Sequence, residues 1–129
     1  MPVPEPYADG EDFEELFPDE AAVPDEAAFR TASRHVDSLT YNRIAALGGF
    51  EALTDFQKEV VREVVCRQAL FESESVDALS SVLSSYSIGG VSMGFAGESW
   101  NVHVENGVAM QRDVYALLRQ TGLCVRVIG

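Results

Sequence analysis

The sequence predicts a mainly α fold, a small helical bundle with three main helices and a short N-terminal one. In two long stretches, apolar residues recur at the three- and four-residue spacing of an α-helix, between residues that typically start and stop helices. A Ser-, Gly- and aromatic-rich segment at about 80–105 instead alternates polar and apolar residues, which is typical of a β-hairpin. The 129 residues, 47% of them hydrophobic, suffice for one core.

The first 24 residues are predicted to form an acidic arm. Ten of the chain's 21 acidic residues lie within positions 1–26, which contain no Lys or Arg, so the net charge of −12 is mostly N-terminal. Phe13, Leu16 and Phe17 fall at helical spacing ahead of Pro18, which predicts one short helical turn that anchors the arm. Because the chain has no basic block, tight binding to nucleic acid phosphates is disfavoured.

The first main helix is predicted over residues 25–47. Pro24 and the acidic residues that follow it suit a helix start, and Gly48-Gly49 suits a left-handed end. The apolar stripe of this helix consists of Phe29, Ala32, Val36, Leu39, Ile44 and Leu47.

Two further helices are expected. Thr54 and Gln57 have the spacing of a capping box and predict a central helix that continues to about Phe71. A third helix is predicted to start after Asn106-Gly107 and to end at Gly122. Its apolar stripe would be Met110, Val114, Leu117 and Leu118.

No residue pattern points to an enzyme, a metal or a cofactor. Cys66 and Cys124 lack the spacing of metal ligands and are expected to be reduced thiols, with Cys66 buried in a helix. His35 and His103 have no neighbouring triad-like arrangement and are expected to be surface or half-buried residues. No apolar stretch reaches the length of about 18 residues that a membrane helix needs, and no signal peptide is expected at the N-terminus.

Three segments together resemble a known family. They are residues 28–44, with the sequence AFRTASRHVDSLTYNRI; residues 61–71, around Cys66 and Ala69; and residues 83–93, with the sequence LSSYSIGGVSM. With a Tyr-containing acidic arm ahead of them, they are similar to the helical head–tail connector (adaptor) family of tailed bacteriophages. The resemblance covers roughly residues 5–123. The sequence departs from the family pattern at Gly89-Gly90, an insertion, and in the C-terminal tail, which matches no motif.

The resemblance implies a structural virion protein without enzymatic activity. Such connectors form a ring beneath the portal, expected to be dodecameric, which extends the DNA channel and receives the stopper or the tail. The chain would be made in the bacterial host cytoplasm and would end up at the head–tail junction. Residues 25–122 would be the helical connector domain, with a strand-like insert at about 80–105, and DNA would pass without specific binding.

The insert and the tail are the candidate contact segments. A strand with free backbone groups can pair with a neighbour, so residues 82–95 are predicted to bridge adjacent subunits, the alternative being a hairpin packed on its own helices. The candidate subunit interface is Tyr86, Ser87, Ile88, Val91, Met93 and Phe95. The tail, residues 123–129, would add a strand to the portal or remain a disordered end. Its candidate docking residues are Val125, Arg126, Val127 and Ile128.

Three other functions compete with the connector. A stopper or tail-completion protein is also small and ring-forming, but such proteins tend to be rich in β-structure. A non-viral helical regulator would bind a partner protein through its acidic arm and would not need a portal. A small hydrolase would need a nucleophile–base pair, which the residue pattern does not indicate.

The N-terminal acids of a connector would either line its channel, where they would repel DNA, or form its solvated outer face.

Overall fold

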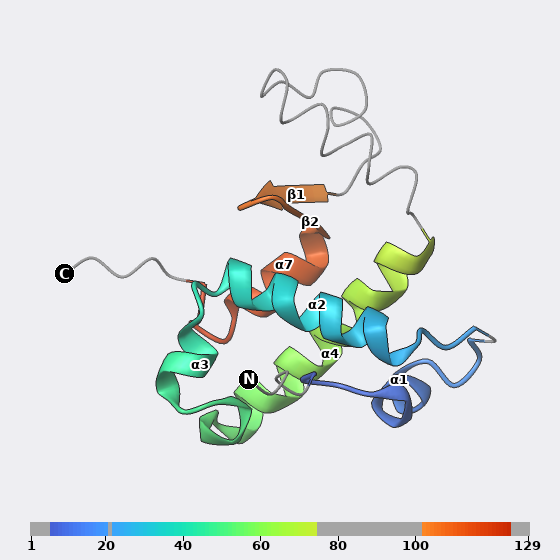
Figure 1. Ribbon diagram of the computed structural model, residues 1–129, viewed down its shortest axis with the longest axis horizontal. Coiled ribbons are helices and arrows are strands. Elements are labelled where there is room, and N and C mark those ends of the chain that lie inside the picture. Colours follow the sequence, from blue (N-terminus) through green and yellow to red (C-terminus); the bar gives the residue numbers. More distant parts are fainter. Residues whose placement is uncertain (1–5, 21, 75–101, 125–129) are drawn as a thin grey trace, which may run out of the picture.

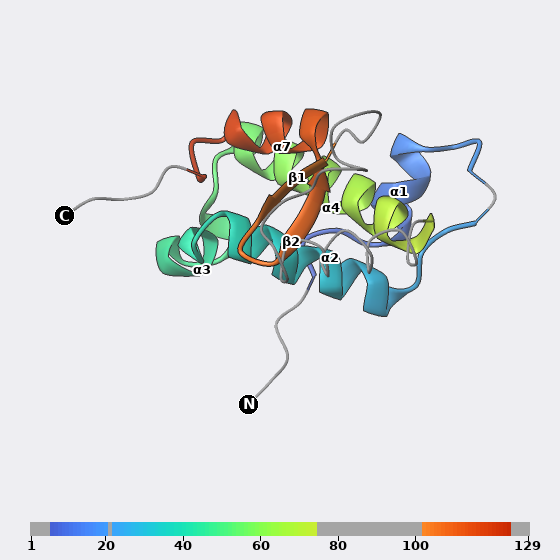
Figure 2. The same cartoon turned by 90° about the horizontal axis from the view of Figure 1, so that it is seen from above.

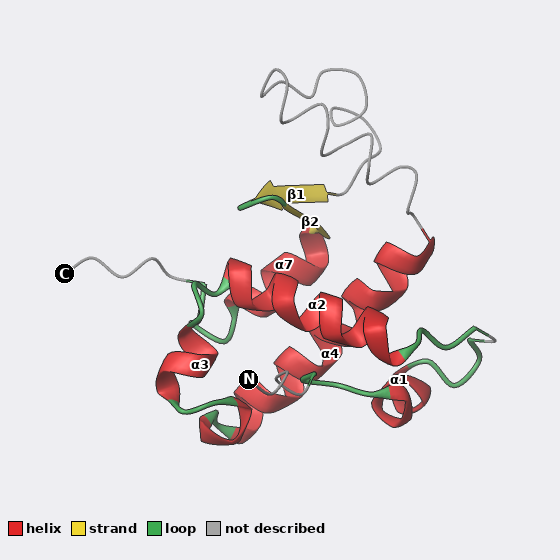
Figure 3. Ribbon diagram, viewed as in Figure 1, coloured by secondary structure: helices red, strands yellow, loops and turns green. Residues whose placement is uncertain are grey.

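The computed structural model describes residues 6–20, 22–74 and 102–124 of the chain. Its elements, in chain order, are α1 (Gly10–Leu16), α2 (Glu26–Leu39), α3 (Arg43–Leu47), the 3-10 turn η1 (Phe50–Ala52), α4 (Asp55–Glu74), β1 (Val102–Glu105), β2 (Val108–Gln111) and α7 (Arg112–Arg119). The predicted mainly α bundle is confirmed: helices dominate the described residues, and one small antiparallel sheet of β1 and β2 accompanies them (Figures 1 and 3).

Helix α4 is the centre of the bundle. It packs against α1, α2, α7 and strand β2, so it is surrounded by the rest of the described fold (Figure 2). Its buried side chains therefore occupy more than one face, and Val61, Val64, Val65 and Cys66 are all fully buried. The predicted capping box is confirmed at its start: Gln57 N donates to Thr54 Oγ1 at 3.1 Å, and Thr54 N donates to Gln57 Oε1 at 3.0 Å.

The N-terminal arm is anchored as predicted. Asp9 caps α1 by accepting a hydrogen bond from Asp12 N, and the helix ends at Leu16, ahead of Pro18. Phe13 is fully buried and contacts the ring of Phe29 on α2, with 6.1 Å between ring centroids. Leu16, in contrast, is 39% exposed, so Phe13 is the side chain of α1 that enters the core.

The predicted continuous helix over residues 25–47 is wrong, because the chain breaks between α2 and α3. Tyr41 and Asn42 both have a left-handed backbone, with φ of 56° and 58°. The end at Gly48 is confirmed, since this residue has a φ of 118° and closes α3. The apolar stripe is buried as expected up to Ile44, whereas Leu47 is 55% exposed.

The predicted start of the third helix is also wrong. Asn106 and Gly107 are the two turn residues of the hairpin, where Glu105 pairs with Val108 and Val102 pairs with Gln111. Their φ angles, 52° and 76°, are the left-handed pair that a tight two-residue hairpin turn requires. Met110 therefore lies in β2, where it is fully buried, and α7 begins two residues later.

Candidate functional site

None of the candidate contact residues proposed from the sequence lies in the described part of the chain. The six candidate interface residues, Tyr86, Ser87, Ile88, Val91, Met93 and Phe95, belong to the segment between α4 and β1. The four candidate docking residues, Val125, Arg126, Val127 and Ile128, follow Cys124, the last described residue. The predicted strand-like insert at 80–105 overlaps the described hairpin only at β1. The points where these segments join the body lie at different ends of it (Figure 1).

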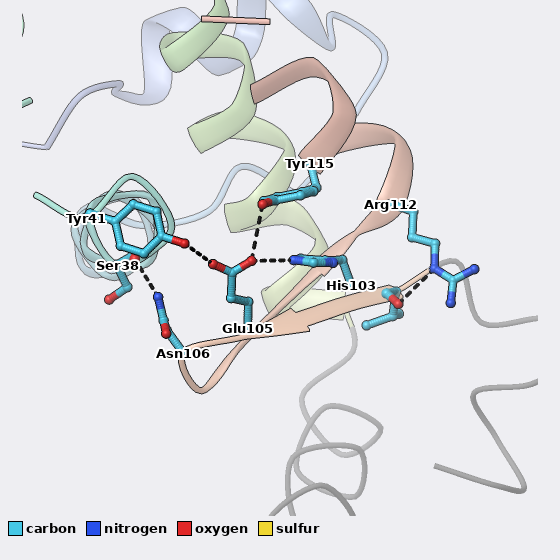
Figure 4. Close-up of polar contacts among 8 residues, drawn as sticks. Ser38, Tyr41, His103, Glu105, Asn106, Arg112 and Tyr115 are labelled. Atoms are coloured by element: carbon cyan, nitrogen blue, oxygen red, sulfur yellow. Dashed lines mark hydrogen bonds and ion pairs between the residues drawn. The ribbon is translucent and has the colours of Figure 1, made fainter. Parts of the chain in front are cut away.

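The densest polar cluster among the described residues is centred on the carboxylate of Glu105, at the end of β1 (Figure 4). Tyr41 Oη donates a hydrogen bond to Glu105 Oε2 at 2.7 Å. His103 Nε2 and Tyr115 Oη lie 2.9 Å and 3.2 Å from Glu105 Oε1. One carboxylate thus joins the α2–α3 break, the hairpin and helix α7.

The partners of Glu105 also determine its electrostatics. The hydrogen bond from Tyr41, and then those from His103 and Tyr115, hold the pKa of the Glu105 carboxyl below its ordinary value despite partial burial. Burial raises the pKa of Tyr115 to about 12, so its hydroxyl remains a donor at neutral pH. The rings of His103 and Tyr115 stack with 3.8 Å between centroids, which fixes both donors toward the carboxylate.

The two ends of the hairpin are held by two further bonds, both visible in Figure 4. Asn106 Nδ2 donates to the backbone oxygen of Ser38, in the last turn of α2, at 3.0 Å. Arg112 Nε, at the start of α7, donates to the backbone oxygen of Val102 at 3.1 Å. The hairpin is therefore connected to elements on both sides of it.

A second junction lies where α4 meets β2. Gln68 is 1% exposed, and its Nε2 donates to the backbone oxygen of Ala109 at 2.8 Å and to Glu72 Oε2 at 2.7 Å. The same carboxylate oxygen of Glu72 pairs with Nδ1 of His35 on α2. The network joins α2, α4 and β2 near the end of α4, which the segment 75–101 follows.

The Glu105 cluster has the residue types of an acid–base site, but its hydrogen bonds serve to connect the α2–α3 break, the hairpin and α7. A general base needs a position beside it for a substrate, and the donors around Glu105 already occupy both of its oxygens. Three surface hollows of the described fold are lined by other residues. One of them, of about 430 Å³, lies between α1 and α4 around the Asp12–Arg62 pair.

The burial of Cys66 and the half-burial of the two histidines agree with the expectations from the sequence. Cys66 is fully buried and free, and burial raises its pKa to about 12. Burial likewise raises the pKa of Cys124 to about 11, so both thiols stay protonated at neutral pH and are weak nucleophiles. His35 and His103 are half-buried. Within the described ranges, no group of three His, Cys, Asp or Glu residues could hold a metal ion, and no helix is long and apolar enough to cross a membrane.

Residues 28–44, which span most of α2, the break and the start of α3, contact several distant parts of the chain. Their apolar side chains enter the core, and their polar side chains hold distant parts of the chain. Ser33 Oγ accepts a hydrogen bond from Tyr7 N at 2.9 Å, and Asp37 Oδ1 accepts one from Tyr7 Oη at 2.6 Å. At the end of this segment, Arg43 Nη1 reaches the backbone oxygen of Leu123 at 3.5 Å.

Sequence reasoning did not identify Glu105 and Tyr41, because both residues acquire their role only through partners distant in sequence. The Asn106-Gly107 pair was a usable signal, since this dipeptide between alternating apolar residues typically indicates a two-residue hairpin turn. No family model, curated protein or solved structure matches the chain. Functional proposals therefore rest on the residues of this chain.

Proposed function

We propose that this chain is a head–tail connector subunit of a tailed bacteriophage, a structural protein that forms a ring beneath the portal. The ring would extend the DNA channel and dock the stopper or the tail. The observation that supports this function is that the N-terminal arm is hydrogen-bonded to the family-like segment, residues 28–44. In the family pattern a Tyr-containing arm precedes this helix, and in this chain Tyr7 bonds to Ser33 and Asp37 within it.

The contacts of residues 28–44 give the family-like pattern a physical reason. Phe29, Ala32 and Val36 supply the buried face of α2. Asp37 receives the arm, and Arg43 receives the turn that precedes the tail. A chance amphipathic helix requires the apolar positions only, whereas here the polar positions of the pattern are also in use.

The layout of the body suits a subunit that must contact more than one neighbour. The segment with the candidate interface residues joins the body between α4 and β1, and the tail follows the turn after α7. Because these attachment points lie at different ends (Figure 1), one segment can reach an adjacent subunit while the other reaches the portal. A ring requires such heterologous contacts, in which one surface meets a different surface of the next copy.

The negative charge of the arm is compatible with a position near a DNA channel. Several carboxylates of the described arm, including Glu11, Glu14 and Glu15, are exposed. Exposed acids do not bind phosphate, and a channel through which DNA slides benefits from few basic attachments. This agrees with passage of DNA without specific binding.

The test is to mix the purified protein with the portal encoded beside it and to image the product by electron microscopy. The expected result is a ring stacked on the narrow end of the portal. Ser87→Pro should abolish the ring while preserving helical circular dichroism, and Ser87→Ala is the matched control that should keep the ring. Rings that persist with Ser87→Pro would remove residues 82–95 from the subunit interface.

A truncation tests the role of the tail. Leu123 is 3% exposed and belongs to the core, so the deletion should start after Cys124. Removal of residues 125–129 should weaken portal binding and leave thermal stability unchanged. Unchanged portal binding would assign docking to another surface.

The competing functions give different images. A ring that binds a preformed portal–connector complex, but not the portal alone, would identify a stopper or tail-completion protein. A chain that stays monomeric or dimeric with the portal at every salt concentration would favour a helical regulator.

A further inference from the structure

The break between α2 and α3 consists of two consecutive residues in a conformation that they rarely adopt. Tyr41 and Asn42 have φ angles of 56° and 58°. The left-handed region brings Cβ close to the backbone carbonyl, so residues other than glycine enter it at an energetic cost, which Asn tolerates better than Tyr. Backbone strain of this kind persists only where surrounding contacts maintain it.

The end of α3 shows what the same geometry looks like when the local sequence favours it. There, Gly49 N donates to Ile44 O at 2.8 Å and Gly48 N donates to Ala45 O at 3.1 Å, the hydrogen-bond pattern of a Schellman cap. Glycine occupies the left-handed position of this cap. The local sequence alone therefore accounts for this helix end.

Helix α2 ends with the same two hydrogen bonds but without glycine. Asn42 N donates to Asp37 O at 2.8 Å, and Tyr41 N donates to Ser38 O at 3.5 Å. Tyr41 thus occupies the left-handed position that Gly48 fills at the end of α3. Nothing in the local sequence requires the break, because residues 25–47 contain neither Gly nor Pro.

A continuous helix through this region would also keep a consistent buried face. Val36, Thr40 and Ile44 are spaced by four residues and are all fully buried. In an uninterrupted α-helix these three positions lie one above the other on the same face. The local pattern is therefore compatible with a single helix from Glu26 to Leu47.

Contacts from the hairpin hold the break open. Tyr41 Oη is bonded to Glu105, whose other oxygen is held by His103 and Tyr115 (Figure 4). Asn106 Nδ2 occupies the backbone oxygen of Ser38. In a continuous helix that oxygen would accept the amide of the residue four positions later, Asn42.

We propose that residues 40–42 are a two-state joint controlled by the hairpin. With the hairpin docked, Tyr41 and Asn42 stay left-handed, and α2 and α3 are separate helices. With the hairpin undocked, the joint closes into one helix over residues 26–47, about 33 Å long at 1.5 Å per residue. A displacement of the hairpin would thereby be transmitted to α3 and to the exposed Leu47 at its end. This inference does not depend on the proposed function.

The test compares two triple variants of the full chain that differ only at position 42. Both carry Tyr41→Phe, which removes the bond to Glu105, and Asn106→Gly, which keeps the left-handed turn but removes the bond to Ser38. One adds Asn42→Ala, which favours a helix, and the other adds Asn42→Gly, which favours the left-handed region. The readout is the backbone ¹³C chemical shifts and helical NOEs of residues 38–44 by NMR.

The expected result is a continuous helix through residues 40–43 with Asn42→Ala and a preserved break with Asn42→Gly. Left-handed shifts at positions 41 and 42 in both triple variants would overturn the proposal, because the break would then be set locally. Should the Asn42→Ala variant not fold, the double variant Tyr41→Phe/Asn106→Gly is measured by relaxation dispersion. Two lost hydrogen bonds, each contributing a factor of about five, should raise the ratio of continuous to broken form about 25-fold. No exchange at residues 40–43 in that double variant would equally overturn the proposal.

Discussion

The hydroxyl of Tyr7 lies 2.6 Å from Oδ1 of Asp37, so the N-terminal arm is bonded to the last turn of α2. The amide of Tyr7 also donates to Ser33, and its ring stacks on Phe50 with 5.7 Å between centroids. Burial is the main reason that the pKa of Tyr7 and the pKa of Asp37 both lie above their ordinary values. The described part of the arm thus belongs to the folded body, although its composition is that of a solvated acidic segment.

Tyr7→Phe should lower the free energy of unfolding at pH 7 by about 1–2 kcal/mol, because the half-buried carboxylate of Asp37 loses a donor. Urea unfolding followed by circular dichroism measures the loss. In an Asp37→Asn background the same change should cost less, since the carboxylate is no longer present. Equal losses in both backgrounds would show that the hydroxyl does not act through Asp37.

Glu105→Gln should destabilise the protein at pH 7 by about 1–2 kcal/mol, because charged acceptors make the stronger hydrogen bonds. The pKa of Glu105 in the folded protein lies below its ordinary value of 4.5, so its contribution is fully present above pH 4.5 and is lost as the pH falls through the folded value. The difference between wild type and variant should therefore shrink below pH 4.5 in urea titrations at stepped pH. A difference that stays constant down to pH 3 would contradict this assignment.

Phe13→Ala should lower the free energy of unfolding by about 3–5 kcal/mol, because Phe13 is fully buried. Leu16→Ala is the matched control in the same helix: Leu16 is 39% exposed, and its truncation should cost about 1 kcal/mol or less. Thermal unfolding followed by calorimetry compares the two. Similar small losses would mean that α1 does not belong to the core.

Gly48→Ala should destabilise the protein by about 1–3 kcal/mol, because Gly48 has a φ of 118° and an added Cβ would lie 3.3 Å from Ala52 Cβ. Gly10→Ala is the control. Gly10 is helical, and its added Cβ would meet Val23 at an ordinary 3.7 Å, so the change should be neutral or slightly stabilising. Chemical denaturation measures the free energy of unfolding of both variants. An unchanged value for Gly48→Ala would refute the argument that a side chain at the end of α3 is strained.

Thr54→Ala should cost about 1 kcal/mol, because it removes one half of the capping box at the start of α4. Thr54→Ser keeps the hydroxyl and should retain most of the stability. Equilibrium unfolding in urea measures both variants. An equal loss for Ser and Ala would indicate that the Thr54 methyl group, not its hydroxyl, stabilises this end of the helix.

Much of the fold could be predicted from the sequence alone, because it depends on interactions between residues close together in the chain. The short anchoring helix, the start of α4 and the left-handed end at Gly48 each depend on residues within about four positions of one another. The buried faces of α2 and α4 follow in the same way from helical spacing. For these elements, local propensity and the tertiary structure favour the same conformation.

Only the tertiary structure decided the break at Tyr41 and Asn42, the strand that contains Met110 and the Glu105 cluster. The break is maintained by Glu105, a partner 64 positions away from Tyr41. Such a contact can outweigh the local preference for a continuous helix, yet it leaves no periodic pattern in the sequence. Met110 has helical spacing with Val114, but pairing with His103 across the hairpin places it in a strand. The sequence by itself thus determined the anchoring helix, the start of α4 and the buried faces of α2 and α4, whereas the connection between α2, the hairpin and α7 depends on contacts that exist only in the folded chain.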